Sequence, residues 1–469
     1  MGKIAASIIM WFNYFVGAYY GVVNIIYTLI LATSLIVIIR HIRRIKYSAM
    51  AEFMVSPETP PVTIIIPAFN ERGQIIPTVE SALSIDYPDF EVIVVNDGSD
   101  DGTIETLIGK FSLEKIDLIY RERIETEPVT GFYYNQAYPA LLVIDKQRGG
   151  KADALNCGVN ASRSPYYCTV DADSVLEKQA LIRLVTPIME STTPVIASGG
   201  VVRVRNGTTL DQGEVTHIDL PGESLATFQV VEYLRAFLFG RVGLDALNGL
   251  LILSGAFSLF NKSAVLSVGG YDRRNVTEDM ELIVKLHKYC RDQDRDYKVK
   301  FISDPICWTE VPVTLKMLAR QRRRWHLGLI ETVMKYKRLL FNGKYGTLGT
   351  LVMPYYLLVE LLSPIVEILG YVSIIIAAIL GVLSLRFFLL FLVLAIFYGI
   401  FLSTSGVFLE EITYRRYPKW SHFFTLLLYG IIENLGYRQI NSFFRVQAFF
   451  QYLRKKNEWE HVSHGRGTK

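Results

Sequence analysis

Two long apolar stretches bracket a region of quite different character, and they constrain the fold more than any other feature. Residues 4–39 contain no charged side chain, and a second apolar region begins at Leu348 and continues through residues 387–409. About 20 apolar residues suffice for a helix to cross the hydrocarbon core of a membrane. We therefore expect membrane-embedded segments at both ends and a soluble domain between them.

Basic residues beside the first apolar stretch predict its orientation. The residues concerned are Arg40, His41, Arg43, Arg44 and Lys46. Such charges stay on the cytoplasmic side of a membrane helix. A cleavable signal peptide has an apolar core of only about 7–15 residues, so this stretch is not one. We expect a multi-pass protein of the cell membrane with a cytoplasmic catalytic domain.

Short apolar runs alternate with helical patterns in the first half of the middle region. The expected strands are 62–66, 90–95, 116–120, 141–144 and 166–170, and the expected helices are 75–84, one after residue 102, and 151–161. This alternation predicts a mostly parallel sheet covered on both faces. Ligands bind beyond the carboxyl ends of such strands, so the residues after each run are site candidates. Residues 121–139 are expected to be a loop or lid, and 229–335 to be largely helical.

The C-terminal apolar region predicts several membrane segments of unequal clarity. Residues 387–409 are a clear span and 368–385 a second candidate, whereas 348–367 contain two prolines and two glutamates, which suggests a broken or interfacial helix. Residues 443–453, followed by three basic residues, are typical of a basic surface helix. The expected domains are 1–46 (transmembrane), 60–340 (cytoplasmic), 346–456 (transmembrane and interfacial) and 457–469 (basic tail).

Composition argues against two classes of protein. The net charge is only +4, and the basic residues form no stripe in the soluble part, so no nucleic-acid partner is expected. The four cysteines form no C-x-x-C pair and lie near no histidine cluster, so no zinc site is expected.

Aspartates directly follow two of the expected strands. Residues 96–99 read N-D-G-S, in which Asp97 can accept hydrogen bonds from a nucleoside, although the same tetrapeptide is an ordinary turn. Asp171 and Asp173 form D-A-D after the strand 166–170. Two carboxylates at this spacing suit Mg²⁺ or Mn²⁺ shared with a diphosphate, and a solvated loop is the alternative.

Three further segments carry chemistry, each with a structural alternative. Residues 149–153 (G-G-K-A-D) open a helix and suit an anion such as diphosphate, or they merely cap the helix. In T-E-D, Asp279 can serve as general base, or Thr277 can cap a helix. Residues 321–325 (Q-R-R-R-W) can bind a leaving diphosphate and a sugar ring, or form a basic band beside the membrane.

In this order the motifs resemble those of the processive, membrane-integrated family 2 glycosyltransferases, which include cellulose, hyaluronan, chitin and poly-N-acetylglucosamine synthases. The resemblance rests on I-P-A-F-N-E (66–71), N-D-G-S (96–99), K-A-D-A-L-N (151–156), D-A-D (171–173), T-E-D (277–279) and Q-x-x-R-W (321–325). It implies an α/β fold: a cytoplasmic GT-A (Rossmann-like) glycosyltransferase domain flanked by N- and C-terminal transmembrane and interfacial helices. It also implies inversion by direct displacement.

The resemblance further implies roles for individual residues. Asp279 is the catalytic base, and Asp173 with Asp171 holds the metal, Mg²⁺ or Mn²⁺. The implied nucleotide-sugar-binding residues are Pro67, Ala68, Glu71, Asp97, Lys151, Asp153, Asp171, Gln321, Arg324 and Trp325. The implied acceptor-site residues are Ser254, Gly255 and Trp325. A Q-x-x-E-Y pattern of the interfacial helix is present as Gln229, Glu232 and Tyr233.

The function that follows is a hexosyltransferase that polymerises a β-linked polysaccharide from UDP-N-acetylglucosamine or UDP-glucose and extrudes it across the membrane. Its expected partners are the UDP-sugar, the growing glycan and membrane lipids, and an export partner is left open. The alternative enzyme adds one or a few sugars to a lipid, and the Q-x-x-R-W pattern favours the polymerase. A transporter with a nucleotide-sensing domain would have no use for Asp279, and an inactive scaffold would have lost carboxylates that this chain retains.

Overall fold

The computed structural model describes residues 2–45 and 50–454, and it divides into two compact units that we treat separately. The sheet unit comprises His41–Pro221 and Leu247–Val311. The described part of the helical unit comprises residues 2–40, 222–246 and 312–454. Lys46 and the expected basic tail, 457–469, lie outside the described residues.

A ten-stranded sheet forms the centre of the sheet unit, in the order β3-β4-β5-β2-β1-β6-β11-β8-β12-β7. Its strands are β1 (Val62–Ala68), β2 (Phe90–Asp97), β3 (Glu114–Ile116), β4 (Val129–Tyr134), β5 (Leu141–Lys146), β6 (Tyr166–Val170), β7 (Ser174–Leu176), β8 (Val195–Val204), β11 (Phe257–Asn261) and β12 (Lys298–Thr309). The four strands β5, β2, β1 and β6 run parallel, so their carboxyl ends share one edge. Strand β11 is antiparallel to β6, and it therefore begins at that same edge.

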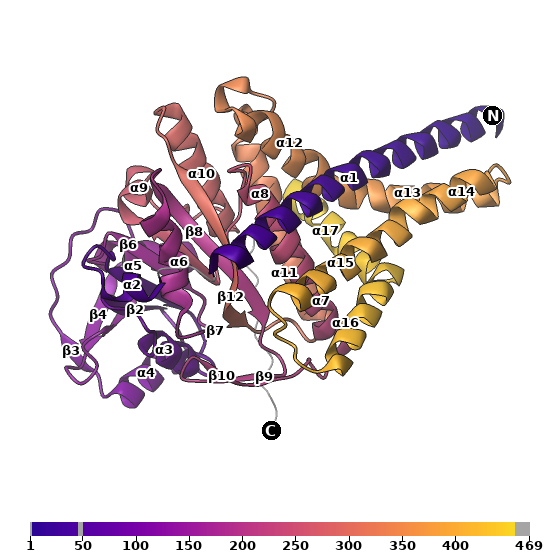
Figure 1. Ribbon diagram of the computed structural model, residues 1–469. Helices are drawn as coiled ribbons and strands as arrows, with labels where there is room; N and C mark the ends of the chain where they lie inside the picture. The colour runs from indigo at the N-terminus through magenta and orange to yellow at the C-terminus, as the bar shows by residue number, and fades with distance from the viewer. Residues whose placement is uncertain (1, 46–49, 455–469) are drawn as a thin grey trace. The chain divides into compact units, whose positions relative to one another are not determined.

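Helices cover both faces of this sheet, which explains why its central strands are mostly apolar rather than alternating. The helices are α2 (Met50–Val55), α3 (Ile75–Leu83), α4 (Thr103–Phe111), α5 (Lys151–Ala161), α6 (Ala180–Glu190), α9 (Lys262–Ser267) and α10 (Glu278–Asp292). Helix α5 packs against β1 and β2, and α6 packs against β8 and β12 (Figure 1). A separate hairpin is formed by β9 (Thr208–Asp211) and β10 (Glu214–Ile218).

The sequence predicted most elements of the first half and missed several later ones. Strands β1, β2, β5 and β6 and helices α3, α4 and α5 confirm the prediction. The expected strand at 116–120 is wrong, because β3 ends at Ile116, and β4 lies within the segment 121–139 that was expected to be a loop. Strands β11 and β12 interrupt the region expected to be largely helical. The sheet is consequently mixed rather than mostly parallel.

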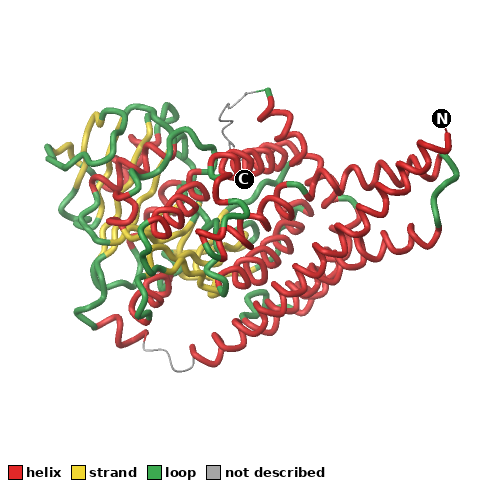
Figure 2. Tube along the Cα trace, turned by 90° about the horizontal axis from the view of Figure 1, so that it is seen from above, coloured by secondary structure: helices red, strands yellow, loops and turns green. Residues whose placement is uncertain are grey.

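Long apolar helices dominate the helical unit. Three are long and apolar enough to cross a membrane: Ser7–Arg40, Leu348–Ile379 and Leu385–Thr413. The first belongs to α1 (Gly2–Ile45), and its residues Val16 and Tyr20 form a buried cluster with Phe391 and Ala395. The remaining helices include α7 (Ser224–Leu234), α8 (Val242–Asp245), α11 (Leu315–Lys335), α12 (Met353–Tyr355), α13 (Ser363–Ile379), α14 (Leu385–Leu392), α15 (Tyr398–Thr413), α16 (Trp420–Ile432) and α17 (Tyr437–Leu453). Figure 2 shows the helices as red tubes and the strands in yellow.

The segment 348–379 is one candidate span, which joins two segments that were expected separately. Within it, π-helical turns at Leu348–Val352 and Tyr356–Leu361 precede α13, which agrees with the broken helix that was one of the two alternatives for 348–367. Pro364 sits in the first turn of α13, where its missing N–H costs no hydrogen bond. Glu367 is buried and bonded to Ser442 and Arg438, so its charge is compensated within the protein.

Candidate active site

The loops that leave β1 and β2 at the common edge are tied together by short polar side chains. Asn70 has a positive φ of 57°, and its side-chain amide exchanges two hydrogen bonds with Asp100, at 2.7 and 3.0 Å. Its backbone N–H donates to Ser99 Oγ at 3.0 Å. Asp97 and its neighbours thus project from a braced pair of loops rather than from a free turn.

The carboxylate of Asp97 holds the loop that leads into α5. Its Oδ1 accepts from Lys146 Nζ at 2.7 Å and from the Gly149 N–H at 2.9 Å, and its Oδ2 accepts from the Gly150 N–H at 2.7 Å. The residue is only 3% exposed. The structure therefore brings together the N-D-G-S and G-G-K-A-D motifs.

Lys151, the first residue of α5, joins two further motifs. Its Nζ lies 2.5 Å from Asp171 Oδ1, after β6, and 3.1 Å from Glu278 Oε1, at the start of α10. Burial alone would lower the pKa of Lys151, but the charges of Asp171 and Glu278 outweigh it and raise the pKa above its usual value. An ammonium in this position neutralises a cluster of carboxylates.

Asp279 is the second residue of α10 and lies beside this cluster. Its Oδ2 accepts from the Gly255 N–H at 3.1 Å, in the segment that enters β11, and its Oδ1 accepts from the Met280 N–H at 2.8 Å. Burial, and then the negative charge of Glu278, raise the pKa of Asp279 to about 6. A carboxylate with such a pKa is a suitable general base near neutral pH.

The two aspartates of D-A-D offer oxygen ligands of the kind that Mg²⁺ and Mn²⁺ prefer. Asp173 Oδ1 lies 3.3 Å from both Ser174 Oγ and Thr309 Oγ1, and Asp171 carries the ion pair with Lys151. In the described part of the chain, no three His, Cys, Asp or Glu side chains gather into a complete metal cage. The donor set thus fits a cation that takes its remaining ligands from a diphosphate.

Other predicted site residues occupy the same edge with different exposure. Pro67 and Ala68 are buried in β1, and the N–H of Glu71 donates to Thr103 Oγ1 at 3.0 Å. Asp153 is fully buried on α5. Its contact with the donor stays a prediction, and its burial favours an indirect role.

Gln321, Arg324 and Trp325 lie on α11, which belongs to the helical unit. There Arg322 is only 2% exposed, forms an ion pair of 2.8 Å with Glu232 and stacks on Trp325. A buried, paired arginine is not part of a basic band beside the membrane, so that alternative is wrong for Arg322.

Sequence reasoning missed three residues of the polar cluster: Lys146, Arg273 and Glu278. Lys146 ends the apolar run of β5, yet its side chain is fully buried. A lysine that closes a buried strand needs a carboxylate partner, which was the available signal. Nothing in the sequence pattern marks Arg273, because its partners come from distant segments.

A family model described as glycosyltransferase like family 2 matches residues 60–328, and the chain belongs to this family. The predicted family, the predicted class of enzyme and the GT-A-like α/β fold are thereby confirmed. One solved structure with this fold is a mannosyltransferase from Pyrobaculum calidifontis in complex with GDP-Man and Mn²⁺. It aligns with a TM-score of 0.51 and 18% identity over 88% of this chain and 99% of that one.

Two curated proteins that are similar to this chain carry the same name. Poly-β-1,6-N-acetyl-D-glucosamine synthase of Staphylococcus epidermidis is 27% identical over 274 residues, which are 58% of this chain and 56% of the relative. The synthase of the same name from Staphylococcus aureus (strain MSSA476) is 29% identical over 320 residues, which are 67% of this chain and 64% of the relative. The matches therefore span between half and two thirds of these relatives.

Proposed function

We propose that the chain is an inverting, processive glycosyltransferase that polymerises a β-linked polysaccharide from a UDP-sugar. The observation that carries this proposal is the position of Asp279. It stands partly exposed at the start of α10, oriented by the Gly255 N–H, with a pKa raised to about 6, beside Lys151 and Asp171. Glycosyl transfer from a nucleotide sugar uses a base for the acceptor hydroxyl, a positive charge for the leaving diphosphate and a carboxylate that binds a metal ion. Asp279, Lys151 and Asp171 are proposed for these three roles.

The reaction follows from these groups. The acceptor hydroxyl attacks the anomeric carbon of the donor, a new C–O bond forms, and the bond from that carbon to the diphosphate oxygen breaks. The proton of the hydroxyl passes to the Asp279 carboxylate. Displacement from the opposite face inverts the configuration. Lys151 provides positive charge where the diphosphate leaves, which stabilises the transition state.

A divalent cation, Mg²⁺ or Mn²⁺, would be held by Asp173 and Asp171 and would neutralise the charge that develops on the leaving diphosphate. The mannosyltransferase that shares this fold is in complex with Mn²⁺, which supports a divalent ion of this kind. Lys151, which pairs with both Asp171 and Glu278, would add a fixed positive charge beside these ligands.

The names of the Staphylococcus relatives support N-acetylglucosamine slightly ahead of glucose as the unit that is added. The Ser254–Gly255 element and Trp325 are proposed for the acceptor, and Pro67, Ala68, Glu71, Asp97, Gln321 and Arg324 for the donor. We also retain the domain plan of 1–46, 60–340 and 346–456, with the catalytic domain in the cytoplasm and the glycan extruded across the membrane. Three helices of sufficient length and apolarity support a multi-pass protein.

A second candidate is transfer of one or a few sugars to a lipid. It would use the same aspartates, and the long apolar helices would then serve to bring the enzyme to its acceptor. The Q-x-x-R-W pattern on α11 favours the polymerase over this alternative.

The test is release of UDP by the purified full-length chain in nanodiscs, across a panel of UDP-sugars with Mg²⁺ or Mn²⁺, with products sized on a gel. We expect turnover with one donor and a high-molecular-weight glycan. A product limited to short glycolipid would replace the polymerase by the second candidate. Retention of UDP release after chelation of divalent ions would contradict the metal assignment.

A further inference from the structure

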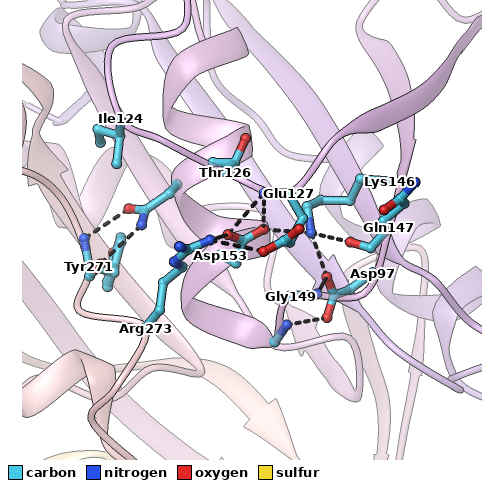
Figure 3. Close-up of polar contacts among 12 residues, drawn as sticks. Asp97, Ile124, Thr126, Glu127, Lys146, Gln147, Gly149, Asp153, Tyr271 and Arg273 are labelled. Atoms are coloured by element: carbon cyan, nitrogen blue, oxygen red, sulfur yellow. Dashed lines mark hydrogen bonds and ion pairs between the residues drawn. The ribbon is translucent and has the colours of Figure 1, made fainter.

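A row of five alternating charges runs through the sheet unit from Asp97 toward the surface. In order the residues are Asp97, Lys146, Asp153, Arg273 and Glu127 (Figure 3). Lys146 lies 2.7 Å from Asp97 and 2.6 Å from Asp153, and the side chains of Lys146 and Asp153 are wholly buried. Arg273 and Glu127, at the other end, are 37% and 43% exposed.

Asp153 is the shared member of this row. Its Oδ1 pairs with Lys146, and its Oδ2 pairs with Arg273 at 2.8 Å. The Glu127 N–H also donates to the Asp153 carboxylate, at 3.2 Å from each of its oxygens. Burial would lower the pKa of Lys146, but its pairs with Asp153 and Asp97 outweigh this and keep it charged.

The two cationic side chains of the row, Lys146 and Arg273, connect Asp153 to different parts of the candidate site. Lys146 holds Asp97, which also anchors the N–H groups of Gly149 and Gly150 before α5. Arg273 belongs to the short segment between Tyr271 and α10, at whose start Asp279 stands. The buried carboxylate of Asp153 therefore pairs with both the cation that holds Asp97 and a cation in the segment that leads to Asp279.

We propose that Lys146 and Arg273 are positioning residues joined by the carboxylate of Asp153: Lys146 fixes Asp97 for the donor nucleotide through their direct ion pair, and Arg273 fixes the approach to Asp279. This inference rests on the proposed function. The row also gives a structural role to the segment 121–139, because Glu127 binds both Asp153 and Arg273. Asn160 of α5 holds the same segment through the N–H groups of Arg123 and Ile124 and the carbonyl of Ile124.

The test uses the full chain and separates nucleotide affinity from turnover. Lys146→Met would remove the cation that Asp97 and Asp153 share and leave Asp153 with Arg273 alone, so Lys146→Met/Asp153→Asn is made beside it, which removes one charge of each sign. Arg273→Met and Arg273→Lys probe the other branch. Arg274→Met, at the exposed neighbouring position, is the matched control.

The dissociation constant of UDP is measured by calorimetry, and kcat for the donor is measured by UDP release. We expect Lys146→Met/Asp153→Asn to weaken UDP binding about tenfold to a hundredfold, as loss of outer-shell support does elsewhere. Arg273→Met should lower kcat by about tenfold while leaving UDP affinity within about twofold. Arg273→Lys should recover part of that loss, and Arg274→Met should match the wild type.

Hydrogen exchange gives a readout that needs no turnover. Arg273→Met should increase exchange in residues 272–279 but not in 147–150, and the double variant should increase it in both segments. Unchanged UDP affinity, kcat and exchange in folded variants would overturn the proposal. A wild-type chain that binds UDP but turns over no donor would count against the proposed function alone, since binding and exchange would still decide this inference.

Discussion

The backbone N–H of Gly255 donates a hydrogen bond of 3.1 Å to Oδ2 of Asp279. Gly255 lies just before β11, and Asp279 is in the first turn of α10, so the bond joins two residues that are 24 positions apart in the chain. The Met280 N–H holds the other oxygen. The carboxylate is thus oriented by backbone groups that do not titrate, which is favourable for a base whose direction matters.

The pH dependence of the reaction should report Asp279. Its pKa is raised to about 6, chiefly by burial and then by the charge of Glu278. The base must be ionised to accept a proton, so kcat/KM should be constant above this pKa and should fall about tenfold per pH unit below it. The measurement is the rate of UDP release at pH values from about 4.5 to about 8.5, a range that lies on both sides of this pKa.

A Lys151→Met variant provides the control for that assignment. The positive charge of Lys151 lowers the pKa of Asp279, so its removal should raise that pKa. The acid limb of the profile should therefore move to higher pH, whatever the absolute rate of the variant. An acid limb that stays in place would mean that another group controls it.

Gly255→Ala should clearly reduce kcat while changing the thermal stability of the protein little. A Cβ at this position would lie 3.1 Å from Lys151 Nζ and 3.3 Å from Asp279 Oδ2, so both groups must shift by a few tenths of an ångström. Small displacements of catalytic groups are costly, and we expect about a tenfold loss of kcat. Steady-state kinetics and a thermal melt of the same preparation check this.

Gly109→Ala is the matched glycine control. It lies in α4, where an added Cβ meets nothing within 4 Å. Alanine is favoured over glycine inside a helix by about 1 kcal/mol, so this variant should be slightly more stable and fully active. Equal kinetic losses in both variants would show that the effect at Gly255 is not local.

The first half of the sheet unit could be predicted because its signals are local. The strands β1, β2 and β6 are mostly apolar, and α5 begins and ends where the sequence predicted. Strand β4 contains Gly131 and follows Pro128, which are typical of a loop, and its pairing with β3 and β5 makes it a strand. Such cross-strand pairing depends on residues distant in sequence and leaves little local trace.

The residues of the candidate site show the same contrast between local signals and contacts between distant segments. Asp97, Lys151, Asp171 and Asp279 could be predicted as candidates because each lies in a short motif near the end of an expected strand or the start of an expected helix. The motif K-A-D gave no indication that Asp153 points inward to Lys146 and Arg273. That arrangement is set by the packing of α5 on β1 and β2, together with a segment more than a hundred residues later.

The ion pair between Arg322 and Glu232 should matter for stability in the helical unit. Arg322→Met would leave Glu232 without the cation that lies 2.8 Å away, although Tyr437 still donates to it. Removal of one partner of a buried pair typically costs about 3–5 kcal/mol. A thermal melt in detergent should show a clear decrease, and Lys316→Met, an exposed change on the same helix, should show almost none.

The most direct test of the central claim is the rate of UDP release by Asp279→Asn. Asparagine keeps the shape of the side chain but cannot accept the proton, so kcat should fall by about a hundredfold or more. UDP binding should be unchanged, and Asp292→Asn, at the far end of the same helix, should retain wild-type turnover. An Asp279→Asn enzyme that keeps more than about half of the wild-type kcat would contradict the assignment of Asp279 as the base.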